Sequence, residues 1–105
     1  MNVSRRGRRE SNSKRRTPAL VFVSQQSSGP SRRMESLVAW VKVTQKKRLR
    51  VIDVDADENP IVVRSLDVSR IPALVLIKDR RVLGRLEGRA TGQQIDDLIR
   101  PHLAA

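Results

Sequence analysis

The side chains best placed to do chemistry are the serines of a short polar loop. The segment Ser27-Ser28-Gly29-Pro30-Ser31 follows the apolar residues 19–23 and precedes residues with helical spacing. A serine nucleophile needs a histidine or carboxylate nearby to take its proton. The sequence positions neither beside Ser28, and the single histidine, His102, comes near the end of the last predicted helix. We therefore expect Ser28 or Gly29 to cap the following helix, with Pro30 in its first turn.

The composition excludes several other chemistries. The chain has 105 residues, which favours one domain, and it contains no cysteine. Disulfides, cysteine metal sites and dithiol chemistry of its own are thereby excluded, and one histidine cannot build a histidine-ligated metal site. No segment approaches the roughly 18 apolar residues of a membrane span, and no apolar signal region follows the first residues. We expect no metal, no cofactor, no membrane span and a cytoplasmic location.

The positive charge is concentrated at the N-terminus. The chain has 22 Lys and Arg against 11 Asp and Glu, a formal net charge of +11. Seven of these cations and one acid, Glu10, fall in the first 16 residues, which leaves +6 there and +5 for the remainder. The seven cations are Arg5, Arg6, Arg8, Arg9, Lys14, Arg15 and Arg16. With almost nothing to bury, residues 1–18 are predicted to form a disordered basic arm, and residues 19–105 a folded domain.

An arginine-rich arm of this kind is suited to phosphate backbones, because each neutralised phosphate releases a counterion. RNA, DNA or a nucleoprotein assembly such as the ribosome is the partner class that the arm favours. An acidic protein or membrane surface, or a tail without a dedicated partner, remain alternatives. No aromatic residue is interleaved among the arginines, which argues against reading single-stranded sequence by stacking.

The apolar patterns of the domain predict strands and helices in alternation. Residues 19–23 form a continuous apolar run, as in a strand covered on both faces. The predicted order is strand 19–23, helix 31–47, strand 49–54, helix 61–66 after an Asn59-Pro60 cap, strands 73–78 and 82–87, and helix 91–103. Asp79-Arg80 would turn the last two strands, although it lacks the glycine that favours tight hairpins. Thr91 and Gln94 have the spacing of a capping box.

The first helix has an apolar stripe and several residues outside it. Met34, Leu37, Val38, Val41 and the stem of Gln45 share one face. Trp40 and Val43 fall on another side, where the tryptophan is either covered by neighbouring loops or part of an exposed patch that meets a partner. Cations follow at the helix end and flank its start: Arg32, Arg33, Lys42, Lys46, Lys47, Arg48 and Arg50. They are either a solvated face or an extension of the arm's positive surface.

The loop and its context resemble the thioredoxin family. Ser28-Gly29-Pro30-Ser31 resembles the Cys-Gly-Pro-Cys loop of thioredoxins with both cysteines replaced, and Arg70-Ile71-Pro72-Ala73 resembles the segment that contains their cis-proline. Residues 51–60 resemble the second core strand and the Asp-rich turn after it. The resemblance implies a minimal α/β thioredoxin-like fold, βαβαββα, with helices on both faces of a four-stranded mixed sheet. Its strand order would be second, first, third, fourth.

Three departures from the family pattern affect function. Thioredoxin has a leading strand and helix where this chain has the arm, so strand 49–54 is predicted to leave an open sheet edge. Phe22 stands where the family places a buried aspartate that carries protons for the dithiol. Ser27 stands where the family has a tryptophan beside the first cysteine. The last two changes favour a natural loss of redox chemistry over a laboratory replacement of the cysteines.

The resemblance implies a binding groove that does not need sulfur. In the family, the Gly-Pro loop, the residue before the cis-proline (here Ile71, before Pro72) and the turn at Gly88 hold an extended polypeptide. The main hypothesis is a redox-inactive binding or adaptor protein, not an enzyme, whose arm docks on nucleic acid or a ribosome. The alternatives are a thioredoxin-type oxidoreductase seen as a Cys-to-Ser variant, and a structural subunit that pairs through its open sheet edge.

Overall fold

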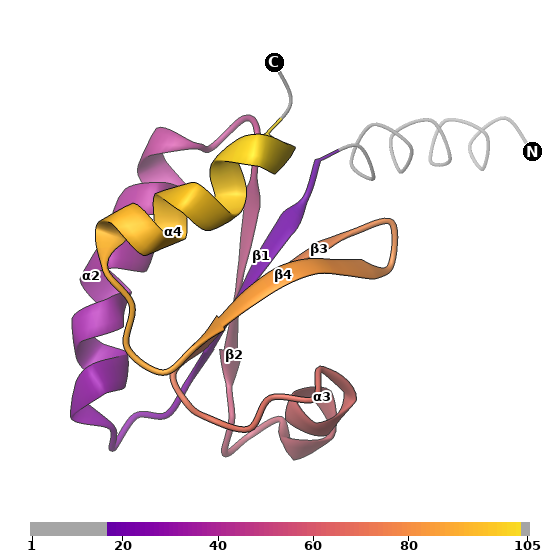
Figure 1. Cartoon of the computed structure of the whole chain (residues 1–105). Coiled ribbons are helices and arrows are strands. Elements are labelled where there is room, and N and C mark those ends of the chain that lie inside the picture. The colour runs from indigo at the N-terminus through magenta and orange to yellow at the C-terminus, as the bar shows by residue number, and fades with distance from the viewer. Residues whose placement is uncertain (1–16, 104–105) are drawn as a thin grey trace, which may run out of the picture.

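The computed structural model describes residues 17–103, so the seven cations of the arm lie outside the described residues. The elements follow the predicted order (Figure 1). They are β1 (Ala19–Ser24), α2 (Gly29–Thr44), β2 (Arg50–Asp55), α3 (Pro60–Ser65), β3 (Ala73–Lys78), β4 (Arg81–Glu87), α4 (Gly92–Ile99) and a short 3-10 helix (Arg100–His102).

The four strands form one mixed sheet in the order β2-β1-β3-β4. β1 pairs with β2 in parallel and with β3 in antiparallel, and β3 pairs with β4 in antiparallel. Ala19 is opposite Arg50 on one side and Ile77 on the other. The predicted sheet order is confirmed, and β2 is an edge strand of the described sheet.

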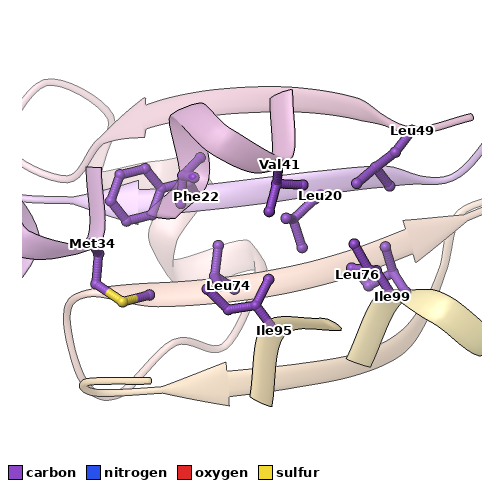
Figure 2. Packing of buried hydrophobic residues seen from close by; sticks show 10 residues of the cluster. Leu20, Phe22, Met34, Val41, Leu49, Leu74, Leu76, Ile95 and Ile99 are labelled. Atoms are coloured by element: carbon purple, nitrogen blue, oxygen red, sulfur yellow. The ribbon is translucent and has the colours of Figure 1, made fainter. Parts of the chain in front are cut away.

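Helices cover both faces of the sheet, and each face has its own apolar cluster. Alternate residues of β1 and β3, such as Leu20 and Leu74, point toward α2 and α4 (Figure 2). The larger cluster there is Leu20, Phe22, Met34, Val38, Val41, Leu49, Leu74, Leu76, Ile95 and Ile99. The other face buries Val21, Val23, Val54, Ala73 and Val75, with Val63 of α3 packed against them. The continuous apolar run in β1 is explained by this double coverage.

The helix ends follow the capping chemistry of the sequence, with one exception. Ser28 caps α2 by accepting from the Ser31 N–H, and Thr91 and Gln94 form the predicted capping box. α4 ends earlier than predicted and continues as a 3-10 turn that contains Pro101, which has no N–H to donate. Asn59 does not cap α3 with its side chain, contrary to the prediction. Its side-chain amide donates to the carbonyl of Asp55 instead.

The β3–β4 hairpin turns at Asp79 and Arg80, as predicted. Both have positive φ, 52° and 67°, which is the left-handed region that tight two-residue hairpins require. Glycine occupies the second of these positions at the lowest energetic cost, because a Cβ is disfavoured there. Arg80 is therefore a strained choice of residue for the tip of this hairpin.

Candidate functional site: the serine loop and the cis-proline

Two of the three serines in the segment Ser27-Ser28-Gly29-Pro30-Ser31, called the serine loop below, accept hydrogen bonds from backbone N–H groups. Ser28 Oγ accepts from the Ser31 N–H at 3.2 Å, and Ser31 Oγ accepts from the Gln25 N–H at 3.2 Å. Ser31 is only 1% exposed, whereas Ser27 and Gly29 face solvent. The two hydroxyls thus stabilise the loop and the start of α2, the capping role that the sequence predicts for Ser28.

Gln25 connects this loop to the turn after β2. Its side-chain amide donates to Asp57 Oδ1 at 3.0 Å, while its own N–H is held by Ser31. Asp57 in turn donates its N–H to Asp55 Oδ1 at 2.9 Å. The loop therefore belongs to a polar network that joins the C-terminal ends of β1 and β2.

The Ile71–Pro72 peptide bond is cis, and Pro72 is buried. The pairing of Val23 with Ala73 places Pro72 at the end of the sheet where β1 leads into the serine loop. The Gly88 N–H donates to the Pro72 carbonyl at 2.7 Å, and Gly88 has φ of 84°. The structure therefore links Pro72 and Gly88 directly, at the same end of the fold as Ser28.

One carboxylate holds the segment before the cis-proline. Glu87 Oε1 accepts from the N–H groups of Ser69 and Arg70, both at 2.9 Å. Arg85 Nη1 lies 3.4 Å from Glu87 Oε2 and donates to the Asp67 carbonyl at 2.9 Å. The N–H groups of Ser69 and Arg70, with a smaller contribution from Arg85, hold the pKa of Glu87 below its usual range. Strand β4 therefore fixes the loop that carries Ile71.

The site contains no arrangement for nucleophilic chemistry within residues 17–103. No carboxylate or imidazole there is hydrogen-bonded to the hydroxyl of Ser28 or Ser31. Phe22 is 2% exposed in the apolar cluster under α2, so no carboxylate occupies its place in β1. The same stretch of chain holds no group of three metal-ligating side chains, and none of its helices is long and apolar enough to span a membrane.

A second surface feature lies between α2 and α4. Trp40 is 69% exposed and Val43 is 72% exposed, so the neighbouring loops of the described chain do not cover the tryptophan. Contact of this exposed patch with a partner stays a prediction. Trp40 lines a hollow of about 330 Å³ together with Leu37, Gln93 and Asp96. The buried Oε1 atom of Gln45, on the same hollow, has no hydrogen-bond partner among the described residues.

The sheet order, the capped loop after β1 and the cis-proline before β3 define a class, the proteins with a thioredoxin fold. Solved structures support that class. Thioredoxin-2, a component of the malaria parasite protein secretion machinery, aligns with a TM-score of 0.77 at 20% identity, over 82% of this chain and 84% of that one. Mitochondrial thioredoxin 3 of Saccharomyces cerevisiae aligns with a TM-score of 0.73 at 21% identity, over 80% and 77%.

The sequence comparisons then give the family. The family model for thioredoxin matches residues 9–101, and the chain belongs to the thioredoxin family. It is 27% identical over 75 residues to a thioredoxin of Listeria monocytogenes, covering 71% of this chain and 73% of that one. It is also 27% identical over 86 residues to a thioredoxin-like protein of Synechocystis, covering 82% and 79%. The predicted resemblance is confirmed, in a member that has no cysteine.

Sequence reasoning missed the two residues that brace the site. Gln25 and Glu87 carry no motif. Gln25 donates its N–H to Ser31 and its side-chain amide to Asp57, and Glu87 accepts the N–H groups of a distant loop, so both roles depend on the folded chain. The sequence showed only a carboxylate at the end of the fourth strand, next to Gly88. That position was a weak signal, because most terminal carboxylates of strands are simply solvated.

Proposed function

We propose that this chain is a redox-inactive thioredoxin-like adaptor that binds an extended polypeptide at its serine-loop end and docks on nucleic acid through its basic arm. The partner of the arm is RNA, DNA or a nucleoprotein assembly such as a ribosome, in the cytoplasm where ribosomes work. The observation that carries the proposal is the pairing of a sulfur-free loop with seven cations in the first 16 residues.

The absence of thiols supports the redox-inactive half. Disulfide exchange requires a thiolate as the attacking group, and a serine hydroxyl has too high a pKa to supply an equivalent anion near neutral pH. Ser28 and Ser31 are moreover occupied by backbone N–H groups. An enzyme that works through this loop would need a nucleophile that the loop does not contain, so we propose binding without turnover.

The cis-proline segment supports polypeptide binding. Among residues 17–103, the described hydrogen bonds leave the N–H and C=O of Ile71 without a partner, while Glu87 and Gly88 fix the residues on either side. A main chain held in place with free donors and acceptors can pair with an extended peptide as a short strand would. The proposed peptide-binding surface therefore consists of the serine loop and Ile71, supported from below by the buried Pro72 and Gly88.

The redox half is tested with an insulin-reduction assay in the presence of thioredoxin reductase. We expect no turnover above the rate without protein. A genuine thioredoxin serves as the positive control. Clear turnover by this sequence as written would overturn the redox-inactive assignment.

The nucleic-acid half is tested by removing residues 2–16. Binding of the full chain to a short mixed-sequence RNA should weaken steeply with salt, and each arm cation that contacts a phosphate adds about 0.7 to the log–log slope. Deletion of seven cations should lower that slope by up to about 5. The matched control replaces the seven cations with glutamine and keeps the arm length. Unchanged binding after deletion would reject the arm as the docking element.

The edge strand supports a second candidate, a structural subunit that pairs through β2. The N–H groups of Arg50 and Ala56 donate to the carbonyls of Pro18 and Ser24 on the β1 side. Because successive N–H groups of a strand point to opposite sides, those of the odd-numbered residues Val51, Asp53 and Asp55 point away from β1, toward the open edge. Such an edge can accept a strand from a partner or a second copy. Sedimentation separates the candidates: pairing through β2 gives association that survives high salt, whereas docking through the arm does not.

A further inference from the structure

The strand register gathers several chain segments at the end of the sheet where β1 begins. β1 starts at Ala19, which pairs with Arg50 and Ile77, the first and next-to-last residues of β2 and β3. The turn from α2 into β2 and the tip of the β3–β4 hairpin therefore lie at this end. In Figure 1 the start of β1 and the end of α2 are in the upper part of the view, and the hairpin extends to the right. The serine loop and α3 lie at the bottom.

These segments carry most of the domain's unbalanced charge. We call the basic end the cations of the α2–β2 turn, of the start of β2 and of the β3–β4 hairpin: Lys46, Lys47, Arg48, Arg50, Lys78, Arg80 and Arg81. Only one carboxylate, Asp79, stands among them. After the arm, the chain has fifteen Lys and Arg and ten Asp and Glu. The rest of the domain thus keeps eight cations and nine carboxylates, a net charge of −1, while the basic end has +6.

The basic end is available to a ligand. Six of its seven cations are exposed, and Lys78 is half-buried. The salt bridges within residues 17–103 join Lys42 with Asp53, Arg85 with Glu87 and Arg100 with Asp96, and none involves the basic end. Neighbouring cations such as Arg80 and Arg81 repel one another, with Asp79 as the one carboxylate among the seven, and an anionic partner would relieve that repulsion.

Arg80 adds an independent observation. It holds φ of 67° at a turn position where glycine is the favoured residue. A strained residue at an exposed tip points to a role outside folding, because a glycine there would serve the hairpin better. The side chain kept at this strained position adds one more cation to the basic end.

We propose that the basic end binds the phosphate backbone of nucleic acid, as a second contact surface that continues the one made by the arm. This inference rests on the proposed function and adds where on the domain the nucleic acid lies. The arm leaves the domain at Pro18, whose carbonyl accepts from the Arg50 N–H, so both surfaces start from the same place. Nucleic acid bound there leaves the serine loop and Pro72 at the opposite end, open to a polypeptide.

The dimensions of the basic end fit a run of phosphates. The register aligns Arg50 with Val82, the residue after Arg81, and three strand spacings of about 4.8 Å put these two backbone positions about 14 Å apart. A duplex strand presents a phosphate about every 3.4 Å along the axis, so this distance covers about four phosphates. The aromatic side chains of the chain are Phe22, which is buried, and Trp40 on α2. With no ring among its seven residues, the basic end recognises backbone charge and not base sequence.

The test uses two matched pairs of arginines in the full chain. Arg80→Gln with Arg81→Gln removes two adjacent exposed cations at the basic end, and Arg32→Gln with Arg33→Gln removes two adjacent exposed cations at the opposite end. Affinity for a short mixed-sequence single-stranded RNA is measured over a range of salt. Two lost phosphate contacts lower the log–log slope of affinity against salt by about 1.4. With equal affinities at about 1 M salt, where the electrostatic contribution vanishes, this slope change gives about 25-fold weaker binding at 0.1 M salt. The Arg32 and Arg33 pair should leave the slope unchanged.

The outcomes separate this inference from the proposed function. The role of the basic end is overturned if the two variant pairs weaken RNA binding equally. It is also overturned if neither pair has an effect while binding still depends on the arm. In both cases the arm remains the docking element. A full chain that shows no salt-sensitive RNA binding overturns both. Vesicles containing anionic lipid and a polyglutamate peptide are tested in parallel, and binding to either that equals or exceeds binding to RNA also overturns the inference. Circular dichroism confirms that both variant pairs are folded.

Discussion

Replacement of Glu87 tests how the cis-proline segment is held. Its Oε1 atom accepts two backbone N–H groups at 2.9 Å, from Ser69 and Arg70, and its other oxygen lies 3.4 Å from Arg85. Glu87→Ala removes both the acceptor and the charge. Glu87→Gln keeps an oxygen acceptor for the two N–H groups and removes only the charge. The two variants therefore divide the contribution of Glu87 into an acceptor part and a charge part.

The size of each part follows from the contacts. Hydrogen bonds to a charged group contribute about 1.5–3 kcal/mol each, and Glu87→Ala loses two of them. Because water can reach the exposed Ser69 and Arg70 afterwards, we expect a total of about 2–4 kcal/mol, toward the lower end of that sum. The ion pair with Arg85 is partly exposed, at 31% and 20% for the two side chains. Such pairs contribute up to about 1 kcal/mol. The charge also strengthens the two N–H bonds, which are the larger cause of the lowered pKa, so we expect Glu87→Gln to cost about 1–2 kcal/mol at neutral pH.

The charge part depends on pH with a definite sign. Glu87 has a lower pKa in the folded chain than the value of about 4.3 in an unfolded chain. Its carboxylate therefore stabilises the fold fully above that unfolded value, and the stabilisation is lost as the pH falls through the lower folded pKa. Urea unfolding, followed by circular dichroism at neutral and acidic pH, should show the difference between wild type and Glu87→Gln shrink toward zero in acid. A difference that stays constant, or Glu87→Ala no less stable than Glu87→Gln, would refute this reasoning.

Three further substitutions give clear expectations. Arg80→Gly should remove the steric cost of the positive φ at the hairpin tip and stabilise the domain by about 1 kcal/mol, a rise in melting temperature of about 4–8 °C. It should also weaken RNA binding, and a lower melting temperature would contradict strain at Arg80. Ser28→Ala should lower the stability measured by thermal unfolding by about 1 kcal/mol. Ser28→Asp should keep most of the wild-type stability, because aspartate also supplies an N-cap acceptor; equal losses in the two variants would contradict a capping role for Ser28. Ser28→Cys with Ser31→Cys should form a disulfide that mass spectrometry detects. This double variant should reduce insulin far more slowly than a genuine thioredoxin, because Phe22 cannot carry a proton. Full activity would instead favour the interpretation as a Cys-to-Ser variant of an oxidoreductase.

The sequence predicted most of the fold because its local signals agree. The apolar run in β1 indicated a strand buried on both faces, and the spacing of Met34, Val38 and Val41 indicated a helix with one buried face. The Thr91 capping box and the Asp79-Arg80 turn are also where the structure has them. In each case a short stretch of chain determines its own conformation.

The remaining features depend on contacts between distant segments. Asn59 bonds the Asp55 carbonyl instead of capping α3, because the turn after β2 brings that carbonyl within reach. Glu87 finds its partners in a loop 17 and 18 residues away. The basic end joins cations that are about thirty residues apart in sequence, and only the strand register brings them together. Periodicity and motif spacing carry no information on such pairings.

The central claim is that the two ends of this domain bind two different partners at once. The most direct test is a two-dimensional NMR titration of the isotope-labelled chain, first with the short RNA and then with an unfolded polypeptide such as carboxymethylated insulin B chain. We predict that RNA shifts the amide signals of the basic end, and that the polypeptide then shifts those of the serine loop, Ile71 and Gly88 while the RNA stays bound. Displacement of the RNA by the polypeptide, or one common set of shifted signals, would contradict the claim.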